Sequence, residues 1–306
     1  MRGPTSWPAG RLRVDGRVGG MPEGHTIHAI AGRIEHAFGG TRPEVSSPQG
    51  RFAESAALLQ GRELVSASAA GKHLFVEFTG DAVVNVHLGL IGSWVVHPGP
   101  AALNPVTGQV RLRIAGELAT ADLRGPNVCA LITPEQQDAI LARLGPDPLR
   151  EDADPERAWT RIQRSRKGIG ELLMDQAVLA GVGNVYRCEV LYRHRVDPFT
   201  PGNALKRKTF DAMWADLVRL LRIGLTYNQI LTMDDQIDEA EALIAAGDAD
   251  TVQTELTGRR LGEHFERRFW LYKRTGEPCL VCGSKVRSQV VAGRNLYWCG
   301  RCQRRH

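Results

Sequence analysis

Two Cys-x-x-Cys pairs near the C-terminus constrain the fold of this chain more than any other feature. The pairs are Cys279–Cys282 and Cys299–Cys302, and sixteen residues (283–298) separate them. Each pair can hold one side of a tetrahedral ion from a tight turn, so together they form a four-sulfur zinc site. Because sulfur fills all four positions, this zinc leaves no place for a catalytic water and is structural. The alternative is a pair of redox-active Cys-x-x-Cys motifs.

The residues between the two pairs predict a β-hairpin. Strand-like residues flank a Gly-Arg-Asn turn that contains Arg294. A module of about 35 residues cannot bury an adequate core, so the metal would supply its folding free energy. An arginine at the tip of such a hairpin can pair with a phosphate through its planar fork of donors, although a solvated turn residue is the alternative.

Charge is unevenly distributed along the 306 residues, whose formal net charge is +5. Residues 223–258 hold eight acidic residues and no Lys or Arg, whereas residues 259–306 hold twelve basic and three acidic ones, a net of 12 − 3 = +9. A basic C-terminal module favours a polyanionic partner such as nucleic acid; a solvated basic face is the alternative. The chain has no apolar run near the roughly 20 residues that span a bilayer and no signal peptide, so we expect a cytoplasmic location and no membrane partner.

The N-terminal half predicts a helix followed by antiparallel strands. Residues 1–20 are rich in Gly, Pro and Arg and are expected to be disordered or absent from the mature protein. Apolar residues from Ile27 to Phe38 recur at helical spacing, which predicts a helix starting close to Pro22, a residue suited to a first helical position. Short β-rich runs separated by turn residues then predict a sandwich or barrel, at 73–78, 82–87, 93–96, 110–114 and 128–132.

The C-terminal half is predominantly helical. The polar segment 144–156, with three prolines, predicts an interdomain linker, and helical patterns dominate residues 159–225. Residues 169–196 predict a helix, a turn and a second helix, with Gly181 and Gly183 ending the first helix and Asn184 capping the second. The free amides at that second N-terminus would form an anion pocket for a DNA phosphate, although an ordinary helical turn is the alternative.

These motifs together resemble the formamidopyrimidine-DNA glycosylase and endonuclease VIII family. The resemblance extends from Met21 to His306 and rests on "MPEG" (21–24), Gly71-Lys72, "HLGLIGSW" (87–94), "LLMDQAVLAGVGNVYRCEVL" (172–191) and the four-cysteine hairpin. It implies an α+β fold with three parts: an N-terminal antiparallel β-sandwich with a catalytic N-terminal helix, a helical domain with a helix–two-turn–helix motif, and a zinc-finger β-hairpin. The implied boundaries are an extension absent from the active enzyme (1–20), a catalytic domain (21–144), a DNA-binding domain (145–265) and the zinc hairpin (266–306).

The resemblance implies a bifunctional DNA glycosylase and abasic-site lyase of base excision repair. The nucleophile of such enzymes is the amine of an N-terminal proline, here Pro22, which attacks the sugar C1′, forms a Schiff base and nicks the strand by β,δ-elimination. An internal proline has its nitrogen lone pair delocalised into the peptide bond and cannot do this. We therefore expect Met21 to be the working initiator and to be excised.

The resemblance also assigns roles to individual residues. Glu23 would be the acid/base residue, Lys72 would contact phosphate near the lesion and assist catalysis, and Leu90 would enter the helix when the lesion base is extruded. Asn184 and Arg294 would be the two DNA contacts of the C-terminal half, with Arg294 also part of the catalytic set. Outside the family, helix-dipole complementarity, a solvated lysine and core packing would explain Glu23, Lys72 and Leu90.

Two departures from the family pattern bear on the substrate. His25-Thr26 stands where the family often has Pro-Glu, so a second acidic residue is missing, and Gly125-Pro126 replaces an Arg-Phe pair of many formamidopyrimidine-type members. With "HLGLIGSW" and "GEPCLVCG", this favours the endonuclease VIII branch and oxidised pyrimidines over 8-oxoguanine.

We expect a monomeric, nucleoid-associated bacterial enzyme with one structural zinc that acts on damaged DNA. A non-catalytic DNA-damage binder, if residues 1–20 are retained, and a zinc-ribbon transcription factor are the alternatives. The acidic charge of residues 234–250 near DNA has no explanation in the sequence.

Overall fold

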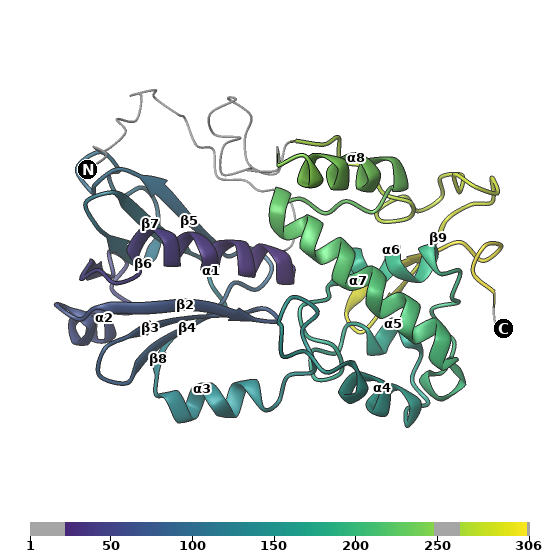
Figure 1. Ribbon diagram of the computed structural model, residues 1–306, viewed down its shortest axis with the longest axis horizontal. Coiled ribbons are helices and arrows are strands. Elements are labelled where there is room, and N and C mark those ends of the chain that lie inside the picture. Colours follow the sequence, from purple (N-terminus) through teal and green to yellow (C-terminus); the bar gives the residue numbers. More distant parts are fainter. Residues whose placement is uncertain (1–21, 248–263, 305–306) are drawn as a thin grey trace.

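The computed structural model describes residues 22–247 and 264–304, which form two halves joined by the segment 142–154 (Figure 1). The expected extension at 1–20, Met21 and the last part of the acidic stretch lie outside these residues. No helix in the described ranges is both long and apolar enough to cross a membrane.

The N-terminal half is the expected antiparallel sandwich. Helix α1 (Gly24–Phe38) lies between the two sheets, and its apolar face forms one core with residues from both (Figure 1). One sheet has the order β1-β6-β7-β5 and the other β2-β3-β4-β8, with all neighbours antiparallel. The strands are β1 (Glu44–Ser46), β2 (Leu64–Ala70), β3 (His73–Phe78), β4 (Ala82–His87), β5 (Ser93–Pro98), β6 (Val110–Ala115), β7 (Ala119–Arg124) and β8 (Val128–Ile132).

The sequence patterns located five of these strands and missed three. Strands β3, β4 and β8 have the predicted bounds, whereas β1, β2 and β7 were not predicted. Strand β2 reads LVSASAA, whose Ala and Ser residues have weak strand propensity, so its pairing with β3 rather than its composition makes it a strand. Helices α2 (Ala53–Leu59) and α3 (Pro134–Leu141) were also missed, although Thr133 and Gln136 form a capping box at α3.

The C-terminal half packs its helices around a second apolar core. The helices are α4 (Pro155–Gln163), α5 (Ile169–Leu172), α6 (Asn184–Arg193), the 3-10 helix η1 (Gly202–Ala204), α7 (Arg207–Tyr227) and α8 (Asp234–Ala245). The expected first helix of the helix–turn–helix segment is a single turn, because α5 ends at Leu172 rather than at Gly181. After this turn, side chains rather than helix carbonyls accept hydrogen bonds from the backbone: Asp175 accepts from the Ala177 amide and Gln176 from the Gly181 amide.

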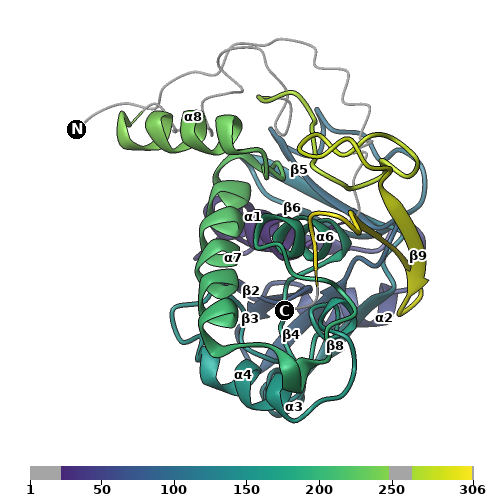
Figure 2. The same cartoon turned by 90° about the vertical axis from the view of Figure 1, so that its right-hand side faces the viewer.

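The zinc-binding region contains the predicted hairpin, formed by β9 (Arg287–Val291) and β10 (Arg294–Trp298). Its turn is Ala292-Gly293 rather than Gly-Arg-Asn, and both residues have positive φ (51° and 71°), as two-residue hairpin turns require. The hairpin packs beside α6 (Figure 2), and a third apolar cluster joins it to Val185 and Tyr192 of that helix.

Candidate active site at the junction of the two halves

Glu23 joins the two halves through its carboxylate. It is the N-cap residue of α1 and is fully buried, and its side chain reaches the start of α6. Oε2 accepts from the amide of Gly183 at 2.9 Å and Oε1 from the amide of Val185 at 2.8 Å. These amides begin α6, where the helix dipole favours a negative charge. A β-carbon on Gly183 would lie 2.7 Å from Cγ and Oε1 of Glu23, so only glycine leaves room for the carboxylate.

This arrangement corrects the expected phosphate pocket at α6. The N-cap is Gly183, Asn184 is the first helical residue, and the amides of Gly183 and Val185 are bound by Glu23 rather than free. A carboxylate of the same chain satisfies those donors without any ligand. Asn184 is buried, its Nδ2 donates to the carbonyl of Asn295 at 2.9 Å, and its Oδ1 accepts from Arg187. An amide NH₂ carries two hydrogens, so the contact to Asn295 uses one of them.

Lys72 enters the same site from the turn between β2 and β3. Gly71 has φ +59°, and a β-carbon there would lie 3.0 Å from Cβ of Ala180, so this turn lies against the loop before α6. Burial lowers the pKa of Lys72, the Glu23 carboxylate raises it, and Arg294 and Arg187 lower it further. The charges of Lys72 and Glu23 are thus close enough to act on each other's pKa.

Glu23 and Lys72 have opposite pKa shifts. Burial raises the pKa of Glu23 above its ordinary value, while the Lys72 ammonium and the amides of Val185 and Gly183 act in the opposite direction. The carboxyl therefore holds a proton more readily, and the amine releases one more readily, than in water. Such a pair is suited to acid–base work during a reaction.

Pro22 lies beside this pair but outside α1. The helix begins at Gly24 with Glu23 as its N-cap, so Pro22 precedes the helix rather than occupying its first position. Pro22 is half-buried, and the next amide, that of Gly24, donates to the carbonyl of Gly181 at 2.8 Å. The start of α1 is thus attached to the same loop that supplies the donors for Glu23.

Arg294 and Arg187 complete the cationic side of the site. Arg294 is the first residue of β10, opposite Val291 at the hairpin tip, and is half-buried. Arg187 was missed in the sequence, because an arginine in a helix is usually solvated. It is fully buried and donates to the carbonyls of Gly170 (3.1 Å) and Val291 (3.4 Å) and to Oδ1 of Asn184. The sequence contained one signal for Arg187: it follows Asn184 by three residues, which places both on one face of a helix.

The four cysteines form a site that fits a structural zinc. Their sulfurs lie within 4.8 Å of one another, with Cys279–Cys302 at 3.8 Å and Cys282–Cys299 at 3.5 Å. A tetrahedron with Zn–S bonds of about 2.3 Å has edges of about 3.8 Å, so the donor set matches zinc in both chemistry and spacing. The hydroxyl of Tyr192 lies 3.1 Å from the sulfur of Cys279, which links the C-terminal end of α6 to the metal site.

Leu90 lies in the loop between β4 and β5 and is 50% exposed, beside Ile91 at 85%. Core packing therefore does not explain it. This loop contacts the one that contains Gly125, because a β-carbon on Gly92 would lie 3.0 Å from the Gly125 carbonyl oxygen. The loop that carries Leu90 and Ile91 and the loop that carries Gly125 thus form one exposed surface.

His25 does not replace the missing acidic residue. Its imidazole is buried, with Nδ1 3.3 Å from the hydroxyl of Tyr186 and Nε2 3.2 Å from that of Thr26. Burial lowers the pKa of His25 to about 3, so the ring is neutral at physiological pH. A β-carbon on Gly224 of α7 would lie 3.1 Å from the ring, which shows that His25 fills the junction of α1, α6 and α7.

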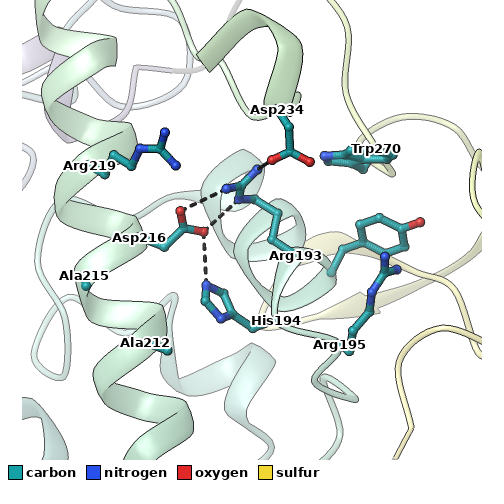
Figure 3. Close-up of a pocket in the computed structure, with 10 residues that line it drawn as sticks. Arg193, His194, Arg195, Ala212, Ala215, Asp216, Arg219, Asp234 and Trp270 are labelled. Atoms are coloured by element: carbon teal, nitrogen blue, oxygen red, sulfur yellow. Dashed lines mark hydrogen bonds and ion pairs between the residues drawn. The ribbon is translucent and has the colours of Figure 1, made fainter. Parts of the chain in front are cut away.

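A pocket of about 380 Å³ lies at the opposite end of α6, between α7, α8 and Trp270 (Figure 3). Arg193 binds Asp216 through Nε at 2.7 Å and Asp234 through Nη1 at 2.6 Å, and His194 contacts Asp216 at 3.1 Å. The acidic residues of α8 pair in the same way: Asp235 with Arg268 and Glu241 with Arg219. The described part of the acidic stretch therefore attaches α8 to arginines of its own half, and the pocket is separate from Glu23.

Comparisons with known proteins agree with this geometry. Residues 21–129 match the family model "Formamidopyrimidine-DNA glycosylase N-terminal domain", residues 144–235 the "Formamidopyrimidine-DNA glycosylase H2TH domain", and residues 276–305 the "Zinc finger found in FPG and IleRS". Endonuclease 8 1 of Mycobacterium tuberculosis is 47% identical over 285 residues, covering 92% of this chain and 100% of that protein. Formamidopyrimidine-DNA glycosylase of Bdellovibrio bacteriovorus is 28% identical over 255 residues, covering 82% of this chain and 86% of that protein.

The fold also matches that of the Lactococcus lactis Fpg in complex with DNA that contains an abasic site, with a TM-score of 0.69, 21% identity and coverage of 92% of this chain and 99% of that one. The similarity thus includes both halves and the zinc hairpin. The chain belongs to the formamidopyrimidine-DNA glycosylase and endonuclease VIII family, whose members are DNA glycosylases with abasic-site lyase activity.

Proposed function

We propose that this chain removes oxidised bases, mainly pyrimidines, from damaged DNA as a monomer, with the amine of Pro22 as nucleophile, and then nicks the strand by β,δ-elimination. The observation that carries the proposal is the position of Glu23. A buried carboxylate with a raised pKa lies next to Pro22 in the chain, at the junction of the two halves, and its charge interacts with that of Lys72.

The nucleophilic step requires a free secondary amine. The neutral Pro22 nitrogen bonds to the sugar C1′ as the glycosidic bond breaks, and the base leaves with its electron pair and takes up a proton. An N-terminal amine has an ordinary pKa near 7.7–8.0, so a useful fraction is neutral at physiological pH. The family match begins at residue 21, which supports a working start at Met21; a free Pro22 amine then requires that Met21 be excised.

The next steps depend on proton transfer by residues of the chain. Glu23 donates a proton to the ring oxygen as the sugar opens, which leaves a Pro22 iminium at C1′. The iminium acidifies the C2′ proton, which the Glu23 carboxylate takes up as the bond between C3′ and the 3′ phosphate oxygen breaks. Loss of the C4′ proton in a second elimination then breaks the C5′–O5′ bond and releases the 5′ phosphate. Lys72 holds a backbone phosphate near the lesion during these steps, with Asn184 and Arg294 as the further DNA contacts.

Zinc has a structural role in this proposal. Bound by the four cysteines, it fixes the hairpin that presents Arg294, and it takes no part in the chemistry because sulfur fills its coordination positions.

The relatives and the loops support the proposed preference for oxidised pyrimidines. The relative named endonuclease 8 1 is 47% identical, whereas the one named formamidopyrimidine-DNA glycosylase is 28% identical. With Gly125-Pro126 at the loop beside Leu90, this supports oxidised pyrimidines over 8-oxoguanine as the main substrate.

Borohydride trapping on duplex DNA tests the proposal. Protein that begins at Pro22 is expected to form a covalent adduct with abasic-site and 5-hydroxyuracil duplexes, and less with 8-oxoguanine. Chain 1–306 and the variant Glu23→Gln serve as controls, the first expected to form no adduct and the second far less product from a base lesion. Absence of an adduct from the Pro22 form would refute the catalytic proposal, and DNA binding without an adduct would identify a damage-binding protein.

A further inference from the structure

Asp147 lies in the segment that joins the two halves and is 3% exposed. Its Oδ2 accepts from the amide of Gly71 at 2.7 Å and contacts Nε2 of His28 at 2.8 Å, and its Oδ1 accepts from the amide of Leu149 at 2.9 Å. An ionised carboxylate only accepts, so Nε2 of His28 carries the proton in this contact. One carboxylate therefore binds the turn before Lys72, the first turns of α1 and its own segment.

Glycines allow these backbone segments to meet around Asp147. A β-carbon on Gly181 would lie 3.4 Å from Oδ1 of Asp147, and one on Gly24 would lie 2.8 Å from Cα of Gly181. A β-carbon on Gly71, whose φ lies in the left-handed region, would contact Ala180. The turn that carries Lys72, the start of α1 and the loop before α6 are thus packed at one point, and Asp147 supplies the charged acceptor there.

We propose that Asp147 is a positioning residue for Lys72. Its carboxylate fixes the Gly71 amide, and this sets the direction in which the Lys72 side chain leaves the turn toward Glu23. His28 in turn fixes the carboxylate from α1. The inference rests on the proposed function, because it assigns to Asp147 a role in the lyase reaction that Lys72 assists.

Only a carboxylate accepts all three hydrogen bonds. Asparagine has nearly the same shape, but its NH₂ group would face either the Leu149 amide or the Gly71 amide and His28, and a donor cannot accept from a donor. Asp147→Asn therefore releases the turn without opening a cavity. Asp175→Asn is the matched control, because Asp175 accepts from the amide two residues later at 2.9 Å, as Asp147 does, but is exposed and is bound to no residue of the Lys72 turn in the described contacts.

The test measures single-turnover strand cleavage of a preformed abasic-site duplex, together with affinity for a duplex that contains a tetrahydrofuran abasic analogue. Asp147→Asn is expected to lower the cleavage rate about 10-fold or more, as displacements of catalytic groups do, and to lower affinity by no more than Lys72→Ala does, since that variant removes the phosphate contact altogether. His28→Asn should lower the rate in the same direction by less, and Asp175→Asn should leave it unchanged. In a Lys72→Ala background, Asp147→Asn should cause no further loss.

A wild-type rate in Asp147→Asn, or a loss that adds fully to that of Lys72→Ala, would overturn the inference, because a general loss of stability acts independently of Lys72. If Asp147→Asn does not fold, the same cycle between His28→Asn and Lys72→Ala decides the question. Absence of cleavage by the wild-type Pro22 form would instead refute the proposed function, so the two failures are distinguishable.

Discussion

The substitution Gly183→Ala tests directly whether the position of Glu23 produces activity. Gly183 has φ −120° and ψ −161°, an extended conformation that alanine adopts without strain. The added methyl group, however, would lie 2.7 Å from Cγ and Oε1 of Glu23 and closer still to Cδ. Ordinary contacts between such atoms are about 3.5 Å or longer, so the carboxylate must move by about 1 Å.

This displacement has a cost in both rate and stability. A catalytic group misplaced by about 1 Å lowers the rate roughly 100-fold. The hydrogen bonds from Gly183 and Val185, at 2.9 and 2.8 Å, would be lost or weakened, and each bond to a charged group contributes about 1.5–3 kcal/mol. We expect a loss of about 3 kcal/mol in the free energy of unfolding, which lowers Tm by about 5 °C in a chain of 306 residues.

Borohydride trapping rates on abasic-site DNA and thermal unfolding measure these effects. Gly32→Ala in the same α1 is the control, because its β-carbon would meet no atom within 4 Å and alanine favours a helix by about 1 kcal/mol. It should keep the wild-type rate and raise Tm slightly. A wild-type trapping rate in Gly183→Ala would refute the claim that Glu23 must lie on the α6 amides.

Three further predictions concern the zinc, the hairpin and the contacts of Asp216 in α7. Chelation should remove one zinc per chain, lower Tm and weaken DNA binding, with recovery on adding zinc; an unchanged Tm would contradict a structural metal. Arg294→Ala should weaken binding to DNA of any sequence and reduce the slope of log affinity against log salt concentration by about one. Arg301, which is exposed in the zinc turn, is the control, and Arg301→Ala should have a smaller effect. Burial would raise the pKa of Asp216, but hydrogen bonds from His194 and Arg193 hold it at about 2. The folded pKa of Asp216 is thus below the ordinary 3.8. Its contribution of about 2 kcal/mol to the free energy of unfolding is therefore present above pH 4 and is lost as the pH falls toward 2. Asp216→Asn should abolish that part of the acid dependence of Tm, and an unchanged acid profile would contradict it.

Local sequence patterns predicted the elements whose residue types have a high propensity for the structure that they form. Strands β3, β4 and β8 are rich in apolar residues and have the expected bounds, and the cysteine spacing located the zinc module. Strand β2, rich in Ala and Ser, depends on its neighbour β3 and has no such local signal.

The contacts within the site could not be predicted in the same way. Glu23 and Gly183 are 160 residues apart in the sequence, and only folding shows that the carboxylate occupies the amides that we assigned to a phosphate. Asp147 belongs to the polar segment that predicted an interdomain linker, a pattern that gives no sign that tertiary packing buries this residue. The residue types indicated the chemistry, whereas their partners depended on tertiary structure.

Helix α6 limits how this protein can diverge in evolution. Every residue from Asn184 to Tyr192 is buried, so the helix has no solvent face on which substitutions are neutral. Its partners are Glu23 at one end, the hairpin along its side and Cys279 at the other, and a change in any turn disturbs at least one of them. New lesion preferences must therefore arise in exposed loops such as the one that carries Leu90 and Ile91, while α6 stays nearly constant.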